Sequence, residues 1–344
     1  MRNILFRAIP WIGDQKDSVK QLCESLGFNA IFAEGAFFGV VQDADSSAHS
    51  SGSVPVPREV MHLDPALLAT CEVLVGTIPP DWLACATNAK WVQAASAGVE
   101  RYLLPGVLPK GAILTNASGA FGVTIAEHMI CGLIMLYRNM QVYQKHQSEH
   151  LWKPEPAWKT ISGSRITVVG LGDLGGEFAK RAHALGAEIT VVRRNVSDKP
   201  NWVSAVYPQG KLTEAVKNAD VVALCVPDTA DTKRMMSREI IDSLQSDAVI
   251  MNVGRGSAID ELALIDALSE KRIAGAVLDV FAQEPLPQDN PLWSFPNVIL
   301  TPHVSGRDID PHNMKIICNL ITENIKRYAN GEPLRNIVDS ARGY

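Results

Sequence analysis

Ile166-Thr167-Val168-Val169-Gly170-Leu171-Gly172-Asp173-Leu174-Gly175 is an apolar run that enters a glycine-rich turn. A helical pattern follows over 174–185, so the stretch predicts a strand, a turn and a helix in succession. Gly170 and Gly172 permit a tight turn and close approach of a pyrophosphate, and Gly175 lets the helix pack on the strand. The helix N-terminus at Asp173 and Leu174 offers N–H groups to the anion. An ordinary βα turn is the alternative, but the flanking strand and helix favour a dinucleotide site.

The pattern of this stretch repeats along the chain. Apolar strand candidates alternate with helical patterns, which is typical of a doubly wound parallel sheet. In the second half these strands are Arg165–Val169, Glu188–Val192, Val221–Val226, Ala248–Val253 and Ala274–Leu278. In the first half, strands over 4–9, 73–76 and 91–95 accompany a helical pattern over 18–26. We therefore predict an α/β fold with two such domains.

The domain boundaries follow from this alternation. We predict a flavodoxin-like substrate-binding domain over 1–117, completed by 308–344, and a Rossmann dinucleotide-binding domain over 118–307. One long helix over 123–147 is expected to bridge them, and a last helix is expected over 308–330. The polar stretch 42–57 is interpreted as a surface loop. The active site is expected in the cleft between the domains.

Composition narrows the class of protein. The 344 residues carry a formal net charge of -5 and a mean hydropathy of +0.04, which gives no basic field for nucleic acid. The sequence has no run of 18 apolar residues, so we predict no membrane span. We interpret residues 1–10 as a first strand and not as a signal segment. The six cysteines are scattered without metal or CxxC spacing. We expect a cytoplasmic protein without nucleic-acid or membrane partners.

The end of the second Rossmann strand predicts which dinucleotide binds. It reads Val191-Val192-Arg193-Arg194-Asn195, without the acid that would bond the ribose 2′-hydroxyl of NAD. A guanidinium can instead bind a 2′-phosphate through paired hydrogen bonds. The alternative is that Arg193 and Arg194 are solvated surface charges, which does not explain the missing acid. NADP is therefore the predicted cofactor, with NADPH preferred over NADH, and either arginine could dominate.

Three polar residues follow in short signatures. Arg255 lies within 252–256, Glu284 within 279–285, and His303 ends Thr301-Pro302-His303. Reduction of a 2-oxo acid needs hydride at C2 and a proton at the carbonyl oxygen, which the imidazole of His303 can supply. Glu284 would orient that imidazole and favour its protonated form, while Arg255 would bind the substrate carboxylate. Each residue alone could be structural, but all three together predict this chemistry.

These signatures resemble those of the D-isomer-specific 2-hydroxyacid dehydrogenase family. The resemblance covers residues from about 90 to 344. Within the family, the chain is most similar to the glyoxylate and hydroxypyruvate reductase branch. The supporting blocks are Ala126-Glu127-His128, Val226-Pro227 with Thr232, Leu278-Asp279-Val280-Phe281, Glu284-Pro285-Leu286-Pro287 with Pro291-Leu292-Trp293, and Ala341-Arg342-Gly343-Tyr344. Asp228 departs from the family pattern, and 42–57 looks longer than the family needs.

The resemblance implies further site residues. Asp279 would contact the nicotinamide carboxamide, although it could instead cap a turn, and Thr124 would lie near the cofactor, although it could instead be a helix N-terminal residue. The loop 96–100 would bind the substrate carboxylate through its backbone. The substrate set implied is Ala97, Gly98, Val99, Arg255 and His303, and the remaining cofactor set is Val226, Pro227, Thr232, Val253, Gly254 and Arg255. The family also implies a homodimer built through the cofactor domain.

The predicted activity is NADPH-dependent reduction of a 2-oxo acid, with glyoxylate or hydroxypyruvate favoured, to the D-2-hydroxy acid. No metal-binding pattern is present in the sequence, so we expect metal-free chemistry with a small-molecule substrate as partner. Larger branched or aromatic 2-oxo acids are the first alternative. A formate dehydrogenase would not need Glu284, and a phosphoglycerate dehydrogenase would be expected to extend beyond Tyr344. A nucleotide-sensing, corepressor-like binding protein is the alternative of a different class.

Overall fold

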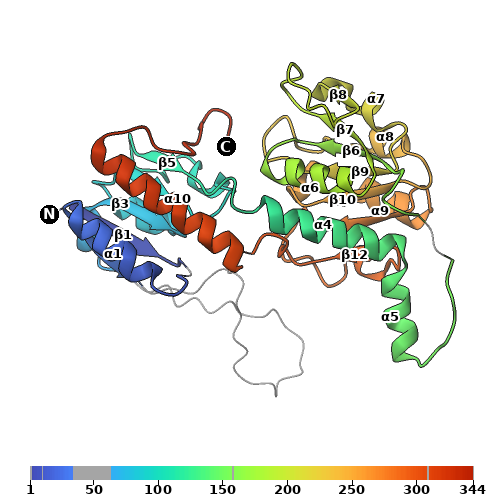
Figure 1. The fold of residues 1–344 in the computed structure, drawn as a ribbon, viewed down its shortest axis with the longest axis horizontal. Coiled ribbons are helices and arrows are strands. Elements are labelled where there is room, and N and C mark those ends of the chain that lie inside the picture. Colours follow the sequence, from blue (N-terminus) through green and yellow to red (C-terminus); the bar gives the residue numbers. More distant parts are fainter. Residues whose placement is uncertain (1, 10, 34–62, 157–158, 308–309, 344) are drawn as a thin grey trace. The chain divides into compact units, whose positions relative to one another are not determined.

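The computed structural model describes residues 2–9, 11–33, 63–156, 159–307 and 310–343. The chain divides into two compact units, each built around its own parallel sheet (Figure 1). Unit 1 is Met1–Ala120 with Asp308–Tyr344, and unit 2 is Phe121–Arg307. The predicted fold class is confirmed. The roles predicted for the two domains stay a prediction.

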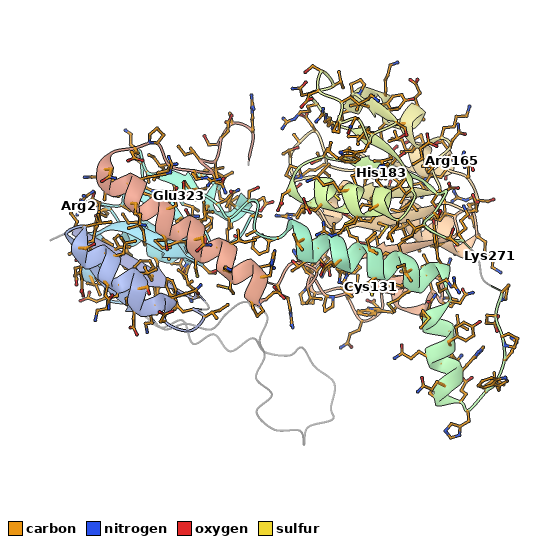
Figure 2. The ribbon with its side chains drawn as sticks, viewed as in Figure 1. Arg2, Cys131, Arg165, His183, Lys271 and Glu323 are labelled. Atoms are coloured by element: carbon orange, nitrogen blue, oxygen red, sulfur yellow. The ribbon has the colours of Figure 1, made fainter. Side chains whose placement is uncertain are left out.

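Unit 1 holds a five-stranded parallel sheet of order β2-β1-β3-β4-β5. Its strands are β1 (Arg2–Arg7), β2 (Phe28–Ala33), β3 (Cys71–Gly76), β4 (Trp91–Gln93) and β5 (Ile113–Thr115). Its helices are α1 (Gln15–Ser25), α2 (Pro65–Thr70), α3 (Pro80–Cys85), η1 (Glu100–Tyr102) and α10 (Pro311–Asn330). Arg2 and Glu323, labelled in Figure 2, lie on β1 and α10.

The C-terminal segment of the chain is an integral part of unit 1. Asn324 of α10 donates to the Gln93 Oε1 atom of β4 at 2.8 Å, and both side chains are fully buried. Val338 N–H donates to Leu114 O at 2.9 Å, which extends this contact to β5. Unit 1 is therefore assembled from both ends of the chain around a shared polar contact.

Unit 2 holds a seven-stranded parallel sheet of order β12-β11-β10-β9-β6-β7-β8. Its strands are β6 (Arg165–Val169), β7 (Glu188–Val192), β8 (Ala205–Tyr207), β9 (Val221–Leu224), β10 (Val249–Asn252), β11 (Gly275–Leu278) and β12 (Val298–Leu300). Its helices are α4 (Gly122–Tyr137), α5 (Met140–Ser148), α6 (Asp173–Ala184), η2 (Gln209–Lys211), α7 (Leu212–Val216), α8 (Arg238–Asp242), η3 (Gly256–Ala258), α9 (Glu261–Ser269) and η4 (Pro291–Ser294). The strand order reverses between β6 and β9, which is the switch point where doubly wound sheets bind ligands.

The central strands of unit 2 are apolar because helices cover both faces of a parallel sheet. Every residue of β9, β10 and β11 is buried. Val222, Ile250 and Ala276 of these strands belong to one cluster of buried residues, which also includes Leu264 and Leu268 of α9. This burial explains why these strands could be predicted from continuous apolar runs.

The single bridging helix predicted over 123–147 is wrong. The structure has two helices there, α4 and α5, which are separated at Arg138 and Asn139. Asn139 adopts a left-handed conformation with φ of 54°, and its side chain donates to Pro156 O at 2.7 Å. Asparagine tolerates this conformation better than most residues, so it can end one helix and begin the next.

The last helix begins at Pro311, because Asp310 caps it by accepting from His312 and Asn313 N–H groups. Its predicted start, Asp308, and the predicted loop 42–57 lie outside the described residues. Among the helices that the structure describes, none is both long enough and apolar enough to cross a membrane.

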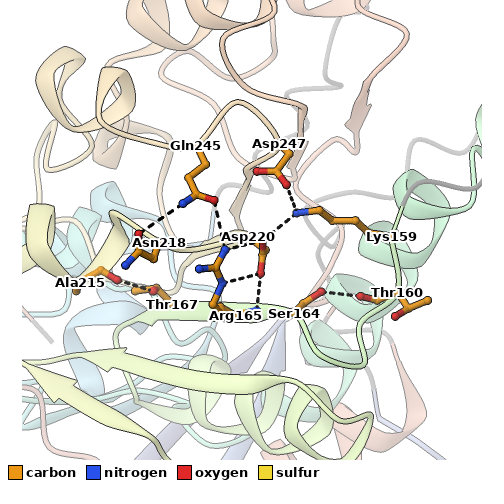
Figure 3. Close-up of polar contacts among 10 residues, drawn as sticks. All are labelled: Lys159, Thr160, Ser164, Arg165, Thr167, Ala215, Asn218, Asp220, Gln245 and Asp247. Atoms are coloured by element: carbon orange, nitrogen blue, oxygen red, sulfur yellow. Dashed lines mark hydrogen bonds and ion pairs between the residues drawn. The ribbon is translucent and has the colours of Figure 1, made fainter.

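An ion cluster around the buried Asp220 lies at the amino end of the unit 2 sheet (Figure 3). The Asp220 carboxylate accepts from Arg165 N–H at 2.8 Å and from Lys159 Nζ at 2.9 Å, and Lys159 also contacts Asp247 at 2.6 Å. Burial by itself raises the pKa of Asp220, but the hydrogen bonds from Arg165 and Lys159 outweigh it and lower the pKa to about 2. The cluster joins the starts of β6 and β9.

Candidate active site

The predicted catalytic residues follow three neighbouring strands of unit 2. Arg255 follows β10, Glu284 comes shortly after β11, and His303 follows β12. These strands are adjacent and parallel, so their carboxyl ends meet at one edge of the sheet. The sheet order thereby gathers residues that are far apart in sequence.

His303 and Glu284 form a hydrogen-bonded pair. The Nδ1 atom of His303 lies 2.8 Å from Glu284 Oε2, and the other Glu284 oxygen accepts from Phe281 N–H at 3.0 Å. The His303 side chain is 53% exposed, so its free ring nitrogen can meet a small molecule. The hydrogen bond to Glu284 raises the pKa of His303 and outweighs its partial burial. Burial raises the pKa of Glu284, but its hydrogen bonds from His303 and Phe281 prevail, so that this pKa is lowered.

Arg255 lies close enough to His303 to act on it electrostatically, and its charge partly lowers the pKa of the imidazole. The backbone around Arg255 is held by Asn252, which is fully buried. Asn252 accepts from Gly254 N–H at 3.1 Å and donates to Arg255 O at 2.9 Å. The guanidinium itself donates to Gly254 O at 2.7 Å. Arg255 is thus within electrostatic range of the His303–Glu284 pair.

Asp279 holds the loop that carries His303. Its carboxylate is 1% exposed and accepts from the Thr301 hydroxyl at 2.6 Å, from Val304 N–H at 2.9 Å, and from the N–H and hydroxyl of Ser305. Its carbonyl accepts from His303 N–H at 2.8 Å. His303 has a φ of 52°, which is uncommon for a residue with a side chain and requires such support.

Two residues of this arrangement had no predicted role. Ser305 directly follows the signature around His303, but nothing in the local sequence marks it as a partner of Asp279. His128 of α4 places its Nε2 atom 3.1 Å from the Thr301 hydroxyl. Because that hydroxyl donates to Asp279, His128 is the donor in this contact. His128 is thus linked to the loop that carries His303.

The glycine-rich turn follows β6 and opens α6 as predicted. Gly170 has a φ of 92°, and a Cβ at Gly175 would lie 1.9 Å from Gly170 O. A Cβ at Gly172 would meet no atom within 4 Å, so packing does not require glycine there. The N–H groups of Leu171, Gly172 and Leu174 donate to no described residue. This turn could hold a pyrophosphate.

Arg193 and Arg194 differ in their surroundings. Arg193 directly follows β7, and the last residue of that strand accepts from Gly170 N–H at 2.8 Å. The Nε and Nη2 atoms of Arg193 are buried, and neither has a hydrogen-bond partner among the described residues. The Arg194 side chain is exposed. A phosphate group would satisfy the buried nitrogens of Arg193.

Other predicted cofactor residues have structural contacts of their own. Asp173 accepts from Gly122 N–H at 2.9 Å, which connects α6 to α4, and the Thr124 hydroxyl donates to Phe121 O in the first turn of α4. Thr232 donates to Pro227 O at 2.6 Å and shapes the loop after β9.

Backbone packing joins the loops after β9 and β10. A Cβ at Gly254 would lie 2.6 Å from Val226 O, and the neighbouring Val253 is buried. Asp228, the departure from the family pattern, accepts from Ser257 at 2.9 Å and so also joins the two loops.

The predicted substrate loop lies in unit 1, at the end of β4. All of its carbonyl groups are engaged: Ser96 O accepts from Ala117, Ala97 O from Asn116, Gly98 O from the Ser96 hydroxyl, and Val99 O from Tyr102. The N–H groups of Ala97, Gly98 and Val99 donate to no residue in the part of the chain that the structure describes. A loop whose carbonyl groups already accept hydrogen bonds, and whose N–H groups are still available as donors, is suited to binding an anion. Within the same described ranges, no three His, Cys, Asp or Glu residues gather as a metal site.

The fold and the site define a nicotinamide-dependent oxidoreductase. A family model described as "D-isomer specific 2-hydroxyacid dehydrogenase, NAD binding domain" matches residues 130–305. A glyoxylate/hydroxypyruvate reductase A of Salmonella heidelberg is 30% identical over 77% of this chain and 85% of that protein. The chain belongs to the D-isomer-specific 2-hydroxyacid dehydrogenase family.

Solved structures agree with this assignment. A D-isomer-specific 2-hydroxyacid dehydrogenase of Xanthobacter autotrophicus, in complex with NADPH and MES, is 28% identical, with a TM-score of 0.78 over 100% of this chain and 99% of that one. A family protein of Aeromonas salmonicida is 26% identical, with a TM-score of 0.78 over 98% of this chain and 99% of that one.

Proposed function

We propose that this protein is an NADPH-dependent reductase of small 2-oxo acids, with glyoxylate or hydroxypyruvate as substrate and the D-2-hydroxy acid as product. The observation that carries the proposal is the His303–Glu284 pair, held beside Arg255 at the carboxyl edge of the unit 2 sheet. A proton donor, an acid that orients it and a cation that binds an anion are the groups that this reduction needs, which supports the proposal. The Salmonella relative, named a glyoxylate/hydroxypyruvate reductase, supports the substrate class.

The residues divide the chemistry between them. When bound, the nicotinamide supplies the hydride that reduces C2. His303, kept protonated by Glu284, donates a proton from its Nε2 atom to the carbonyl oxygen. Arg255 binds the substrate carboxylate and polarises the carbonyl group. In unit 1, the open N–H groups of Ala97, Gly98 and Val99 are proposed to bind a carboxylate group.

The preference for NADPH is assigned to Arg193. The glycine turn would hold the pyrophosphate, and the guanidinium of Arg193, with two buried and unpaired nitrogens, would bind the 2′-phosphate. The Xanthobacter relative, which was crystallised with NADPH, supports this preference. Arg194 is exposed and is assigned a secondary role.

A substrate panel tests the activity. NADPH oxidation is followed with glyoxylate, hydroxypyruvate, pyruvate, 2-oxoisocaproate and phenylpyruvate, and then repeated with NADH. The highest kcat/KM is expected for glyoxylate and hydroxypyruvate with NADPH. Preference for the branched or aromatic acids would refute the proposed substrate class, and no turnover with either cofactor would refute the proposed activity.

Replacing His303 tests the proton donor. His303→Ala should lower kcat by about 10²- to 10⁴-fold, the usual contribution of a positioned general acid, while the Kd for NADPH stays nearly unchanged. His312→Ala, an exposed histidine at the start of α10, is the matched control. Wild-type kcat in the His303 variant would exclude this residue as the acid.

Replacing Arg193 tests the cofactor preference. Arg193→Gln should raise the KM for NADPH by about tenfold or more, as expected for loss of a charge-assisted contact, and leave the KM for NADH almost unchanged. Arg194→Gln should have the smaller effect. An equal loss with both cofactors would show that Arg193 acts only on the structure of the loop after β7.

A further inference from the structure

We propose that Arg7 is a carboxylate-binding residue of unit 1, which supplies positive charge next to the substrate loop 96–99. The inference rests on the proposed function, and it adds to the substrate site a residue outside every signature described above. The ligand class is a small carboxylate anion, such as a 2-oxo acid or oxalate.

Arg7 is a partly buried cation that has no acidic partner among the described residues. It is the last residue of β1, its Nη1 atom donates to Thr77 O at 2.5 Å, and its guanidinium lies 5.1 Å from the ring centre of Trp82. Its Nε atom is buried without a hydrogen-bond partner. Among the described residues, no Asp or Glu forms an ion pair with it. A buried guanidinium that is bound only to a neutral carbonyl leaves unsatisfied charge.

A second cation lies near Arg7. Burial lowers the pKa of Arg7, and the nearby charge of Arg101 lowers it further, while Tyr102 opposes both effects. Arg101 donates to the Tyr102 hydroxyl at 2.8 Å. The charge of Arg101 therefore adds to the positive potential at Arg7, which favours an anion at that position.

Tyr102 connects this basic group to the substrate loop. Its hydroxyl accepts from Ile78 N–H at 3.1 Å, directly after the Thr77 carbonyl that binds Arg7. Its backbone N–H donates to Val99 O at 2.9 Å. The ends of β1, β3 and β4 are adjacent in the parallel sheet, so Arg7 and the loop occupy the same edge.

The two elements complement each other chemically. The loop offers open N–H groups but no charge, whereas Arg7 offers charge and an unused donor. A carboxylate can accept from backbone N–H groups with one oxygen and from a guanidinium with the other. Unit 1 thus has both components of an anion site.

Oxalate binding tests this role without requiring turnover. Its Kd is measured calorimetrically, with and without NADPH, for the wild type, Arg7→Met, Arg7→Lys and the control Lys16→Met, which removes an exposed charge of the same unit. We expect Arg7→Met to weaken oxalate by about tenfold or more, Arg7→Lys to restore part of the loss, and Lys16→Met to have no effect. In glyoxylate reduction, Arg7→Met should raise KM by a similar factor and change kcat by less than about threefold.

Several results would overturn the proposal. Wild-type oxalate affinity in Arg7→Met, or no oxalate binding by the wild type, would exclude the anion site. Equal losses of thermal stability and NADPH affinity in both Arg7 variants would assign the residue a structural role. Oxalate binding that depends on Arg7, in a protein that reduces no 2-oxo acid, would uphold the site and refute the proposed function instead.

Discussion

The protonation of His303 depends mainly on a single neighbour. The hydrogen bond from its Nδ1 atom to Glu284 is the largest influence on its pKa, ahead of burial and of the Arg255 charge. The imidazole of His303 therefore keeps a proton that its Nε2 atom can donate up to a higher pH than an ordinary histidine does. In the proposed mechanism, this contact sets the pH range over which reduction can proceed.

Glu284→Gln should therefore change the pH profile of reduction. In the wild type, kcat/KM falls as pH rises through the raised pKa of His303, because the neutral imidazole cannot donate a proton. Removing the carboxylate charge lowers that pKa, so the falling limb should move to lower pH. Rate-pH profiles check this, with the surface variant Glu270→Gln as control. An unshifted limb would show that Glu284 does not govern the titration.

The candidate catalytic residues were easier to select from the sequence than the contacts that support them, and their catalytic roles stay a prediction. Arg255, Glu284 and His303 could be predicted because each lies in a short signature whose residue types suit the chemistry. The contacts of Asp279 could not be predicted, because they join residues that are 22 to 26 positions apart in the sequence. The sequence does not show how the chain between them folds back. The same limit applies to His128, whose partner Thr301 is 173 residues away.

At the scale of elements, the glycine turn is defined by close contact between strand and helix. A Cβ at Gly175 would overlap Gly170 O, whereas a Cβ at the next residue, Gly176, would meet nothing within 4 Å. Two neighbouring glycines of α6 thus have opposite steric requirements, although they look alike in the sequence.

Alanine substitutions at these two glycines should separate their roles. Gly175→Ala should force α6 away from β6 and weaken NADPH binding strongly, with a loss of thermal stability. Gly176→Ala should leave binding intact and stabilise the helix by up to about 1 kcal/mol, since alanine is the better helix former. NADPH titration and thermal unfolding measure both effects. Equal behaviour of the two variants would contradict the packing described for Gly175.

The elements that could be predicted are those with a strong local pattern. The central strands of unit 2 are continuous apolar runs because both faces are covered, and β6 and β7 were predicted with their observed bounds. The short strands β5, β8 and β12 were not predicted, because three residues carry too little pattern and depend on distant partners. The break at Asn139 was missed because it depends on one left-handed residue.

At the scale of the molecule, the cluster around Asp220 makes the stability of unit 2 depend on pH. The pKa of Asp220 is depressed to about 2, so its contribution is present above its ordinary pKa and is lost as pH falls toward about 2. The carboxylate is mostly buried, which limits screening by solvent.

Asp220→Asn should lower the free energy of unfolding of unit 2 by about 2 kcal/mol near neutral pH. The difference from the wild type should shrink as pH falls below about 4, because the wild-type carboxylate then loses its advantage. Calorimetric unfolding across this range provides the measurement. Asp247→Asn, at a carboxylate that is 44% exposed, should have the smaller effect. A pH-independent difference would mean that the variant acts through packing alone.

The two halves of unit 1 bracket unit 2 in the chain, and this order has a consequence during synthesis. Unit 2 is a continuous segment, so it can fold as soon as its last strand leaves the ribosome. Unit 1 must wait for α10, because Asn324 is the partner of the buried Gln93 side chain. We therefore expect that unit 2 is already folded in the nascent chain while unit 1 is still incomplete. The loop 96–99 and Arg7, which belong to unit 1, should then reach their final surroundings last.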